Sequence, residues 1–397
     1  MGFPYLQRRA GLYGLVHLRE KKDPRQLVQC HLHDLLPLQC VLDHGHPLGL
    51  QQSLRLPVLV HLSDSDSLSI DQSSCLGGPG SQDWLDIIGL CSLYSIHVDD
   101  YLVMKTLTVF TPTYNRAHTL PRVYESLKSQ TCKDFEWLVV DDGSTDGTER
   151  LVQSWINEGV LPVRYIYKEN DGLYTGYNAA YENIETELNV CVDSDDAMPE
   201  DAVEKIVNLW NTEGSEKYCG IIGLDIDMDT LEPIGGRFPE GMTECYFPEL
   251  YARNIHRGDT KQVMRTDLMK EVAPQVGFPG EKNFNPVYML LQVTDKYPLL
   301  VLNEPLCLVQ YQDADSMSRN IYRQYLDSSR SFAKMRRLEM GLEHSTWLNR
   351  FRCSIHYVSE CLLVRNRRWL SEAPRKGLAL LAFIPGLVFY ILIRIKR

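Results

Sequence analysis

The sequence lacks the Cys-x-x-Cys pairs and regularly spaced cysteines that mark zinc sites and disulfide frameworks. Its 11 cysteines are scattered over 397 residues, so we expect reduced thiols, mostly buried, in a cytosolic setting. An excess of positive charge is also lacking: 52 Asp or Glu outnumber 41 Lys or Arg, and the net charge of −11 argues against a protein that binds the phosphate backbone of nucleic acid. No internal repeat is evident. The N-terminus lacks a charged segment followed by an apolar stretch and a small-residue cleavage site, so no signal peptide is expected.

No apolar run reaches the roughly 20 residues that a helix needs to cross a bilayer. The strongest candidate is GLALLAFIPGLVFYILI, the 17 residues from Gly377 to Ile393, which has cationic residues on both sides and Pro385-Gly386 in its middle. We expect residues 376–397 to form a membrane-associating segment, inserted shallowly or as a re-entrant hairpin. A buried core helix is the alternative.

Charge is divided unevenly along the chain. From Ser316 to the end there are 16 Lys or Arg and 5 Asp or Glu, a net charge of +11, which leaves −22 for the first 315 residues. The basic region 313–375 is predicted to be helical. It would suit an anionic membrane surface or form a solvated helical face. We therefore expect the protein at the cytoplasmic face of the cell membrane, held through its C-terminus.

Residues 1–103 differ from the remainder of the chain. They contain long stretches rich in Leu, Gln and Pro, and amphipathic periodicity does not persist in them. A clean strand pattern begins directly after Met104. Two explanations stay open: either the native chain begins at Met104, or the first 103 residues are a disordered extension.

Apolar segments alternate with amphipathic ones from Lys105 onward. We expect strands at 107–114, 135–142, 163–170, 188–196, 218–227 and 298–311, and helices near 120–130, 144–159, 174–187 and 199–213. Near-continuous apolar strands separated by helices indicate an α/β domain with a mostly parallel sheet covered on both faces. We place this domain at residues 104–312.

Polar clusters follow three of the predicted strands. They read TPTYNR at 111–116, DDGS at 141–144 and DSDD at 193–196. The carboxyl ends of strands in an open α/β sheet meet at one edge, where ligands bind. Three carboxylates within four positions, Asp193, Asp195 and Asp196, would repel one another there, so a counter-charge is required.

The order of these motifs resembles a known family. PTYNR, then QTCKDFE, then VVDDGSTDGT, then VDSDD is similar to the family 2 glycosyltransferases, over about residues 107–310. The resemblance implies the GT-A fold, which is Rossmann-like with a mostly parallel sheet flanked by helices. It also implies an inverting transferase that uses a nucleotide-sugar donor, expected to be a UDP-sugar, with Mn²⁺ or Mg²⁺.

The resemblance assigns roles to residues of the donor site. Pro112 and Tyr114 would frame the nucleobase, and Asp142 would accept a hydrogen bond from the uracil edge. Asp193 would contact the ribose or the metal, and Asp195 would ligate the metal. Hard oxygen ligands suit Mg²⁺ and Mn²⁺, which bind through one or two carboxylates plus substrate phosphates. The cation and the diphosphate would then supply the counter-charge.

The segment KENDGLYTGYN at 168–178 matches the family's connection to the acidic motif. Asp171 and Asn178 are candidate donor contacts, with ordinary turn chemistry as the alternative. Many relatives have Ala-Arg where this chain has Thr-Gly-Tyr at 175–177, so an arginine contact to the diphosphate is not expected there.

Inverting transfer requires a base that deprotonates the acceptor hydroxyl. Glu281 in GFPGEKNFNP is our first candidate and Asp259 in HRGDTK the second. A subgroup of the family carries Glu after the proline of this region, where this chain has Pro286-Val287. Because this chain lacks a carboxylate at that position, an impaired transferase stays an alternative.

Acidic residues also precede the basic helices. Asp313, Asp315 and Ser316 are predicted either to close over the donor diphosphate or to form a solvated linker. We expect transfer of a sugar to a hydroxyl of a glycan or lipid-linked acceptor, in cell-envelope or exported polysaccharide synthesis. The alternative is a catalytically impaired nucleotide-sugar-binding partner of a polysaccharide assembly complex. A dinucleotide-binding fold or a pyrophosphorylase is disfavoured, because no glycine-rich basic loop follows the first strand.

Overall fold

The structure is a computed structural model that describes residues 60–62, 68–70, 105–310 and 321–396. The chain divides into two compact units, Met1–Ser95 and Ile96–Arg397. In the first unit the described residues form a short antiparallel pair, β1 (Val60–Leu62) and β2 (Leu68–Ile70). The predicted start at residue 104 and the predicted acidic loop at 313–316 lie outside the described residues.

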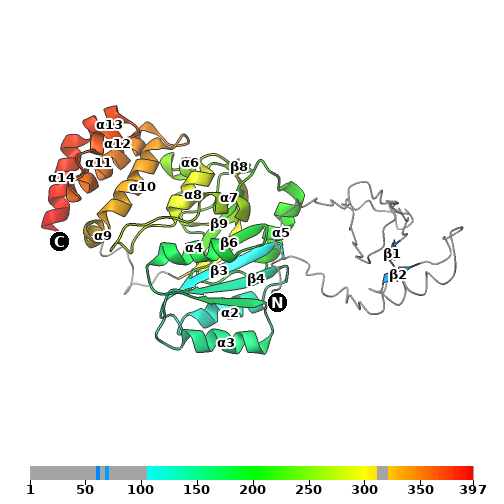
Figure 1. The fold of residues 1–397 in the computed structure, drawn as a ribbon. Helices are drawn as coiled ribbons and strands as arrows, with labels where there is room; N and C mark the ends of the chain where they lie inside the picture. Colours follow the sequence, from blue (N-terminus) through cyan, green and yellow to red (C-terminus); the bar gives the residue numbers. More distant parts are fainter. Residues whose placement is uncertain (1–59, 63–67, 71–104, 311–320, 397) are drawn as a thin grey trace, which may run out of the picture. The chain divides into compact units, whose positions relative to one another are not determined.

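An eight-stranded mixed sheet lies at the centre of the second unit (Figure 1). Its spatial order is β5-β4-β3-β6-β9-β7-β10-β8. The strands are β3 (Leu107–Thr113), β4 (Phe135–Asp141), β5 (Val163–Tyr167), β6 (Leu188–Cys191), β7 (Gly220–Asp227), β8 (Glu244–Cys245), β9 (Thr260–Arg265) and β10 (Leu299–Val309). Strands β3 to β6 pair in parallel, as do β7 and β10.

The sheet is less parallel than the sequence predicts. Strand β9 lies between β6 and β7 and is antiparallel to both, and β8 is antiparallel to β10. The sequence analysis missed β9 because four of the six residues of TKQVMR are polar and no apolar run marks it. The β/α alternation therefore describes the first half of the sheet correctly and the second half incompletely.

Helices cover both faces of the sheet (Figure 1). One face packs against α2 (Leu120–Lys128), α3 (Thr148–Glu158) and α5 (Ala202–Glu213), whose buried residues share a core with Val109 and Trp137. The other face packs against α4 (Leu173–Asn183), α6 (Phe247–Ala252), α7 (Thr266–Val272) and α8 (Val287–Thr294), around Phe110 and Leu138. Successive strand residues thus enter opposite cores, as the pleat requires.

Some helix ends follow the residues that favour them and others differ from the prediction: the helix predicted at 144–159 begins at Thr148, and the one predicted at 174–187 ends at Asn183. Gly159 ends α3 in a left-handed conformation, with φ of 68°, as a glycine there predicts. The predicted helix at 199–213 instead begins at Ala202. Pro199 lies in the turn before it, and its carbonyl accepts the Ala202 amide at 3.0 Å.

In the part of the chain after the sheet that the structure describes, there are six helices. They are α9 (Ile321–Asp327), α10 (Ser329–Gly341), α11 (Trp347–Leu363), α12 (Trp369–Glu372), α13 (Lys376–Leu381) and α14 (Phe383–Ile395). Pro385 lies in the first turn of α14, where a proline is tolerated, so the chain bends at Ala382 and not at Pro385-Gly386. In the described part of the chain, no helix is both long and apolar enough to cross a membrane.

Candidate active site

The acidic loop at 193–196, which follows β6, is held in place by hydrogen bonds to its backbone. The carboxylates of Asp193 and Asp195 remain available to bind a ligand. Arg122 donates to the Asp195 carbonyl at 2.6 Å, and Ala197 pairs with Leu308 of β10 in both directions. Asp193 is exposed and Asp195 half-buried. Within the described residues, the only side-chain hydrogen bond of either carboxylate is a long one from the Cys191 thiol to Asp193, at 3.9 Å.

This donor set fits a divalent cation only in combination with a ligand. The described part of the chain holds no group of three or more His, Cys, Asp or Glu residues arranged to bind a metal ion. Mg²⁺ and related hard cations are commonly held by one or two carboxylates together with substrate phosphates and water. Asp193 and Asp195 are therefore sufficient protein ligands if the donor supplies the remainder.

Two further carboxylates at this edge are buried. Asp196 receives a weak hydrogen bond from the Cys307 thiol at 3.8 Å, and burial raises its pKa to about 7. Asp225, near the end of β7, is only 4% exposed. One of its oxygens has no hydrogen-bond partner among the described residues, and burial raises its pKa to about 6.

A lysine on β9 supplies positive charge to this cluster. The Lys261 ammonium group attracts Asp225, Asp196 and Asp193, in that order of strength, and these attractions raise its pKa in spite of burial. Part of the counter-charge that the sequence analysis assigned to a cation and diphosphate therefore belongs to the protein. The sequence analysis missed Lys261 together with its strand. It also missed Asp225, although a lone carboxylate inside the apolar segment GIIGLDID was a usable signal.

The loops after β3 and β4 are joined beside the acidic loop. The Asn115 side-chain oxygen accepts a hydrogen bond from the backbone amide of Thr145 at 2.8 Å. The backbone amide of Asn115 donates to the Ser144 hydroxyl, also at 2.8 Å. Pro112 is buried, whereas the Tyr114 side chain is 49% exposed. Because β3 lies between β4 and β6, the residues predicted to contact the base stand next to those predicted to hold the metal.

Asp142 is the centre of a hydrogen-bonded loop. Its buried carboxylate pairs with Lys168, accepts from the Asn170 side chain at 3.1 Å, and accepts from the backbone amides of Asp171 and Gly172, both at 3.2 Å. Both oxygens thus have partners within the protein. Its contact with a uracil edge stays a prediction, and the structure adds that it shapes the loop at 168–172.

The other two residues predicted to contact the donor, Asp171 and Asn178, differ in whether their side chains are already hydrogen-bonded within the protein. Asp171 is exposed, and its backbone amide is the group that binds Asp142. The Asn178 side chain exchanges two hydrogen bonds with the backbone of Gln275, at 2.9 and 2.8 Å. Asn178 therefore connects α4 to the segment before the predicted base, and its donor contact stays a prediction.

The candidate bases lie in different surroundings. Glu281 accepts the backbone amides of Arg330 and Ser331 at 3.1 and 2.8 Å, and the Ser331 hydroxyl at 2.8 Å. Its carboxylate is thus engaged at the start of α10. Asp259 is exposed and lies close enough to Asp225 to raise the pKa of that residue. Both stay candidate bases: the Asp259 carboxylate interacts with Asp225, and the Glu281 carboxylate is bound to the start of α10.

Comparison with known proteins identifies the domain. Residues 108–272 match the sequence profile of glycosyl transferase family 2. These residues belong to that family. The family and the GT-A fold, both predicted from the sequence, are thereby confirmed.

Named relatives agree with this assignment. The chain is 35% identical to glycosyltransferase GlyA of Streptococcus pneumoniae over 105 residues, which cover 26% of this chain and 15% of GlyA. It is 28% identical to the poly(ribitol-phosphate) β-N-acetylglucosaminyltransferase TarS of Staphylococcus aureus over 184 residues, 45% of this chain and 30% of TarS. The chain thus spans less than a third of either relative. A crystal structure of TarS residues 1–349 superposes with a TM-score of 0.50 at 16% identity, covering 72% of this chain and 90% of that one, which shows a shared fold.

Proposed function

We propose that the protein transfers a sugar, with inversion, from a nucleotide-sugar donor to a hydroxyl of a glycan or lipid-linked acceptor. The observation that carries the proposal is the pair of available carboxylates, Asp193 and Asp195, at the sheet edge of a family 2 domain. With a bound Mn²⁺ or Mg²⁺, they would hold a Lewis acid against the departing nucleoside diphosphate. A UDP-sugar is the donor we expect.

The remaining roles follow from position along the same edge. The exposed Tyr114 ring is available to pack against the nucleobase. The loop organised by Asp142 would present Asp171 to the donor. One of the two candidate bases, Asp259 or Glu281, would take the proton from the acceptor hydroxyl. Because relatives include enzymes named for poly(ribitol-phosphate), a polymer of the cell envelope is the acceptor class that we favour.

UDP release from candidate UDP-sugars, measured with and without Mn²⁺, tests this proposal. We expect Mn²⁺-dependent release that falls at least a hundredfold in Asp195→Asn, because removing one electrostatic contact to the reacting group typically costs that much. Asp201→Asn is the matched control, since Asp201 lies six residues further on and pairs with Lys205 at 2.9 Å. Release that is equal in Asp195→Asn and the control would contradict the proposal.

A second candidate function is a nucleotide-sugar-binding protein without turnover. It is favoured by Val287 in place of the subgroup's glutamate and by the engagement of Glu281 at the start of α10. Donor binding by calorimetry separates the two functions. Binding with no UDP release from any donor, in wild type and in Glu281→Gln alike, would support the binding protein.

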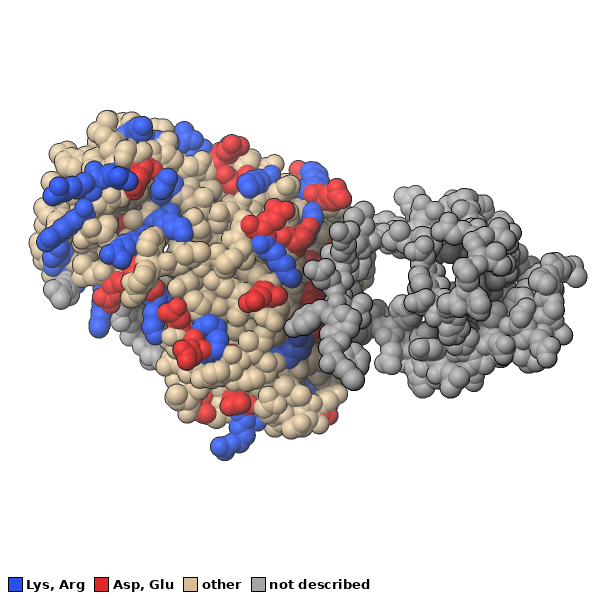
Figure 2. All heavy atoms as spheres, in the orientation of Figure 1, with Lys and Arg blue, Asp and Glu red and all other residues tan. Residues whose placement is uncertain are grey.

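We further propose that α13 and α14 attach the protein to the cytoplasmic face of the cell membrane. One side of α14 packs on α11, where Gly386 approaches Val358. The other side of α14 and the end of α13 expose large apolar side chains: Leu381, Ile384, Val388, Ile391 and Ile395 are 46–73% exposed. Lys or Arg residues lie at both ends of this pair of helices. Over the helices that Figure 1 labels α10 to α14, the charged side chains visible in Figure 2 are mostly Lys and Arg.

Sedimentation with vesicles that contain anionic lipid tests this attachment. Leu381→Ser with Ile384→Ser should reduce the bound fraction severalfold, because each substitution removes apolar area that would enter the interface. Val276→Ser is the control, since Val276 is 67% exposed but lies on the loop before α8. Equal binding of all three proteins would contradict membrane attachment through these helices.

A further inference from the structure

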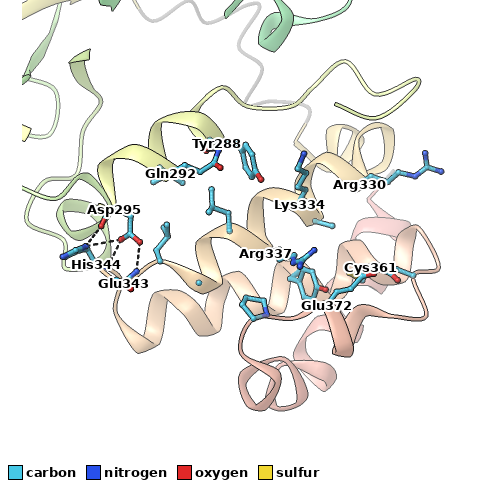
Figure 3. A pocket seen from close by; sticks show the side chains of 18 of the residues that line it. Tyr288, Gln292, Asp295, Arg330, Lys334, Arg337, Glu343, His344, Cys361 and Glu372 are labelled. Atoms are coloured by element: carbon cyan, nitrogen blue, oxygen red, sulfur yellow. Dashed lines mark hydrogen bonds and ion pairs between the residues drawn. The ribbon is translucent and has the colours of Figure 1, made fainter. Parts of the chain in front are cut away.

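The segment at 276–281, which ends in the first candidate base, is held by two successive turns of α10. The Glu281 carboxylate accepts from the first turn, at Arg330 and Ser331. One turn further on, Lys334 donates to the carbonyl of residue 276 at 3.0 Å. Figure 3 shows Lys334 in the lining of a cavity of about 1420 Å³ between α8, α10 and α11, with the Arg330 side chain pointing away from this space. Arg330 contacts Glu281 through its backbone amide.

These contacts leave part of the Glu281 carboxylate free. Oε2 accepts from both the amide and the hydroxyl of Ser331, each at 2.8 Å, and Oε1 accepts the Arg330 amide at 3.1 Å. Each oxygen of an ionised carboxylate offers about two lone pairs. Among the contacts of the described residues, both lone pairs of Oε2 are used and one on Oε1 is left. The contact with α10 therefore orients the carboxylate and still leaves a position that can accept a proton.

Ser331 is held more firmly than the glutamate that it binds. It is only 1% exposed, whereas Glu281 is half-buried. Met335, one turn further along α10, packs in the core that also contains Phe110 of β3. Because the first turn of α10 is fixed to the same core as the sheet, a hydroxyl donated from it can set the direction of the Glu281 side chain.

The residue after Glu281 contacts the donor side. Lys282 donates to the Asn170 side chain at 2.7 Å. A Cβ on Gly172 would lie 2.2 Å from the Lys282 carbonyl oxygen, so the two segments touch. Asp142 accepts the backbone amide of Gly172 at 3.2 Å. The candidate base is thus fixed from α10 on one side, next to a residue that touches the loop predicted to bind the donor.

We infer that Ser331 is a positioning residue of the transfer reaction, which directs Oε1 of Glu281 toward the acceptor hydroxyl. The inference rests on the proposed function and deepens it, because it selects Glu281 as the base and makes the start of α10 part of the active site. The acceptor hydroxyl gives its proton to Oε1 while its oxygen bonds to the anomeric carbon. The bond from that carbon to the nucleoside diphosphate breaks, and its electron pair leaves with the diphosphate.

A kinetic double-mutant cycle between Ser331→Ala and Glu281→Gln tests the inference. The assay is UDP release from UDP-sugars with Mn²⁺, in which water takes the place of the acceptor hydroxyl. We expect Ser331→Ala to lower kcat about tenfold, because a misdirected base loses its alignment with the reacting atoms, and to leave the donor KM unchanged. In the Glu281→Gln background the same substitution should change kcat little, since residues that act as a unit are not additive.

Two further variants separate positioning from support of the helix. Ser329→Ala is the matched control, because Ser329 is a buried serine of the same turn whose hydroxyl donates to carbonyls of α9; its kcat should equal that of wild type. Ser331→Thr keeps the hydroxyl, and its added methyl group can enter a cavity of about 230 Å³ that Ser331 lines. We expect Ser331→Thr to restore most of the kcat that Ser331→Ala loses.

The outcomes distinguish this inference from the proposed function. An unchanged kcat in Ser331→Ala, an equal fall in both backgrounds, or a similar fall in Ser329→Ala would overturn the inference while UDP release by wild type still supports the proposed function. Absence of UDP release from every donor in wild type would overturn the proposed function, and the inference with it.

Discussion

Lys282 donates a hydrogen bond to the Asn170 side chain at 2.7 Å, although 112 residues separate them in the chain. The same ammonium group reaches the Asn170 carbonyl at 3.2 Å. Asn170 also donates to Asp142, so the segment that carries the predicted base is tied to the loop predicted to bind the donor. Several measurable consequences depend on this connection and on related ones.

Lys282→Met should weaken donor use without unfolding the protein. The substitution keeps the aliphatic stem but removes both hydrogen bonds to Asn170, so the loop at 168–172 loses one of its supports. We expect the KM for the donor to rise roughly three- to tenfold, corresponding to about 1 kcal/mol for a charged hydrogen bond near the surface. Lys133→Met, which removes an exposed contact within the α2–β4 connection, should leave KM unchanged. An unchanged KM in both variants would contradict the support role.

Gly172→Ala should be more damaging than an alanine at another glycine with positive φ. Gly172 has φ of 96°, and a Cβ there would lie 2.2 Å from the Lys282 carbonyl oxygen. Gly159 also has positive φ, of 68°, but a Cβ there meets no atom within 4 Å. Gly159→Ala carries the cost of a left-handed alanine, about 1 kcal/mol, whereas Gly172, with ψ of 157°, lies in a region that alanine hardly populates and carries a larger backbone cost. Only Gly172→Ala should also lower kcat/KM for the donor by more than tenfold, and an equal loss in both would rule out the close approach as its cause.

Glu281→Gln should destabilise the start of α10. The glutamate accepts two backbone amides of the first turn, and its negative charge also favours that end of the helix dipole. We expect a loss of about 1 kcal/mol, or roughly 2–4 °C in the thermal midpoint for a domain of this size. Glu125→Gln removes an exposed carboxylate from α2 and should change the midpoint little. An unaltered midpoint in Glu281→Gln would show that the capping contacts are not significant for stability.

Lys261→Met should destabilise the protein, and the loss should grow as pH rises. The pKa of Asp225 is already raised to about 6 by burial, and removing the nearby ammonium group would raise it further. The folded state then keeps a proton that the unfolded state has released, so stability falls with increasing pH between the two pKa values. We expect a deficit of about 2 kcal/mol at pH 8, smaller at pH 5. Lys217→Met, at an exposed ion pair, is the control, and a deficit independent of pH would contradict the role assigned to Lys261.

Gly386→Ala should loosen α14 from α11. A Cβ at this position would lie 2.7 Å from Cγ1 of Val358, so the helices must separate. Overpacking of this kind costs about 1–3 kcal/mol, and protease should cut residues 376–396 more readily. At Gly377 of α13 a Cβ meets nothing within 4 Å, so Gly377→Ala should be neutral or slightly stabilising. Similar proteolysis of both variants would contradict the close packing of Gly386.

The sequence predicted the part of the fold that local pattern determines. The first four parallel strands and the helices between them were predicted, with ends that differ by up to five residues, because β3, β4 and β6 are mostly apolar and the helices that separate the strands have an apolar side. Strand β9 was missed because its burial comes from insertion between β6 and β7, which its own residues do not reveal. The antiparallel pairings of the second half of the sheet depend on such long-range contacts.

The candidate site was predictable to a similar extent. Motif order placed Tyr114, Asp142 and Asp193 at one edge, and the pairing of β3 with β4 and β6 confirms that they share it. The partners of these side chains were not predictable. Two features depend on segments that meet only in the folded chain: the backbone amides around Asp142 and the interaction of Lys261 with the acidic loop.

Glu281 and Lys282 are consecutive residues that hold different parts of the molecule, the first the start of α10 and the second the Asn170 loop. Neighbouring Cα atoms stay 3.8 Å apart across a trans peptide, so these two anchorages cannot drift independently. If the C-terminal helices bind a lipid surface, as proposed above, a force that tilts them would be transmitted through this dipeptide to the loop at 168–172. Substrate engagement and anchoring of the enzyme would then be linked by the backbone itself.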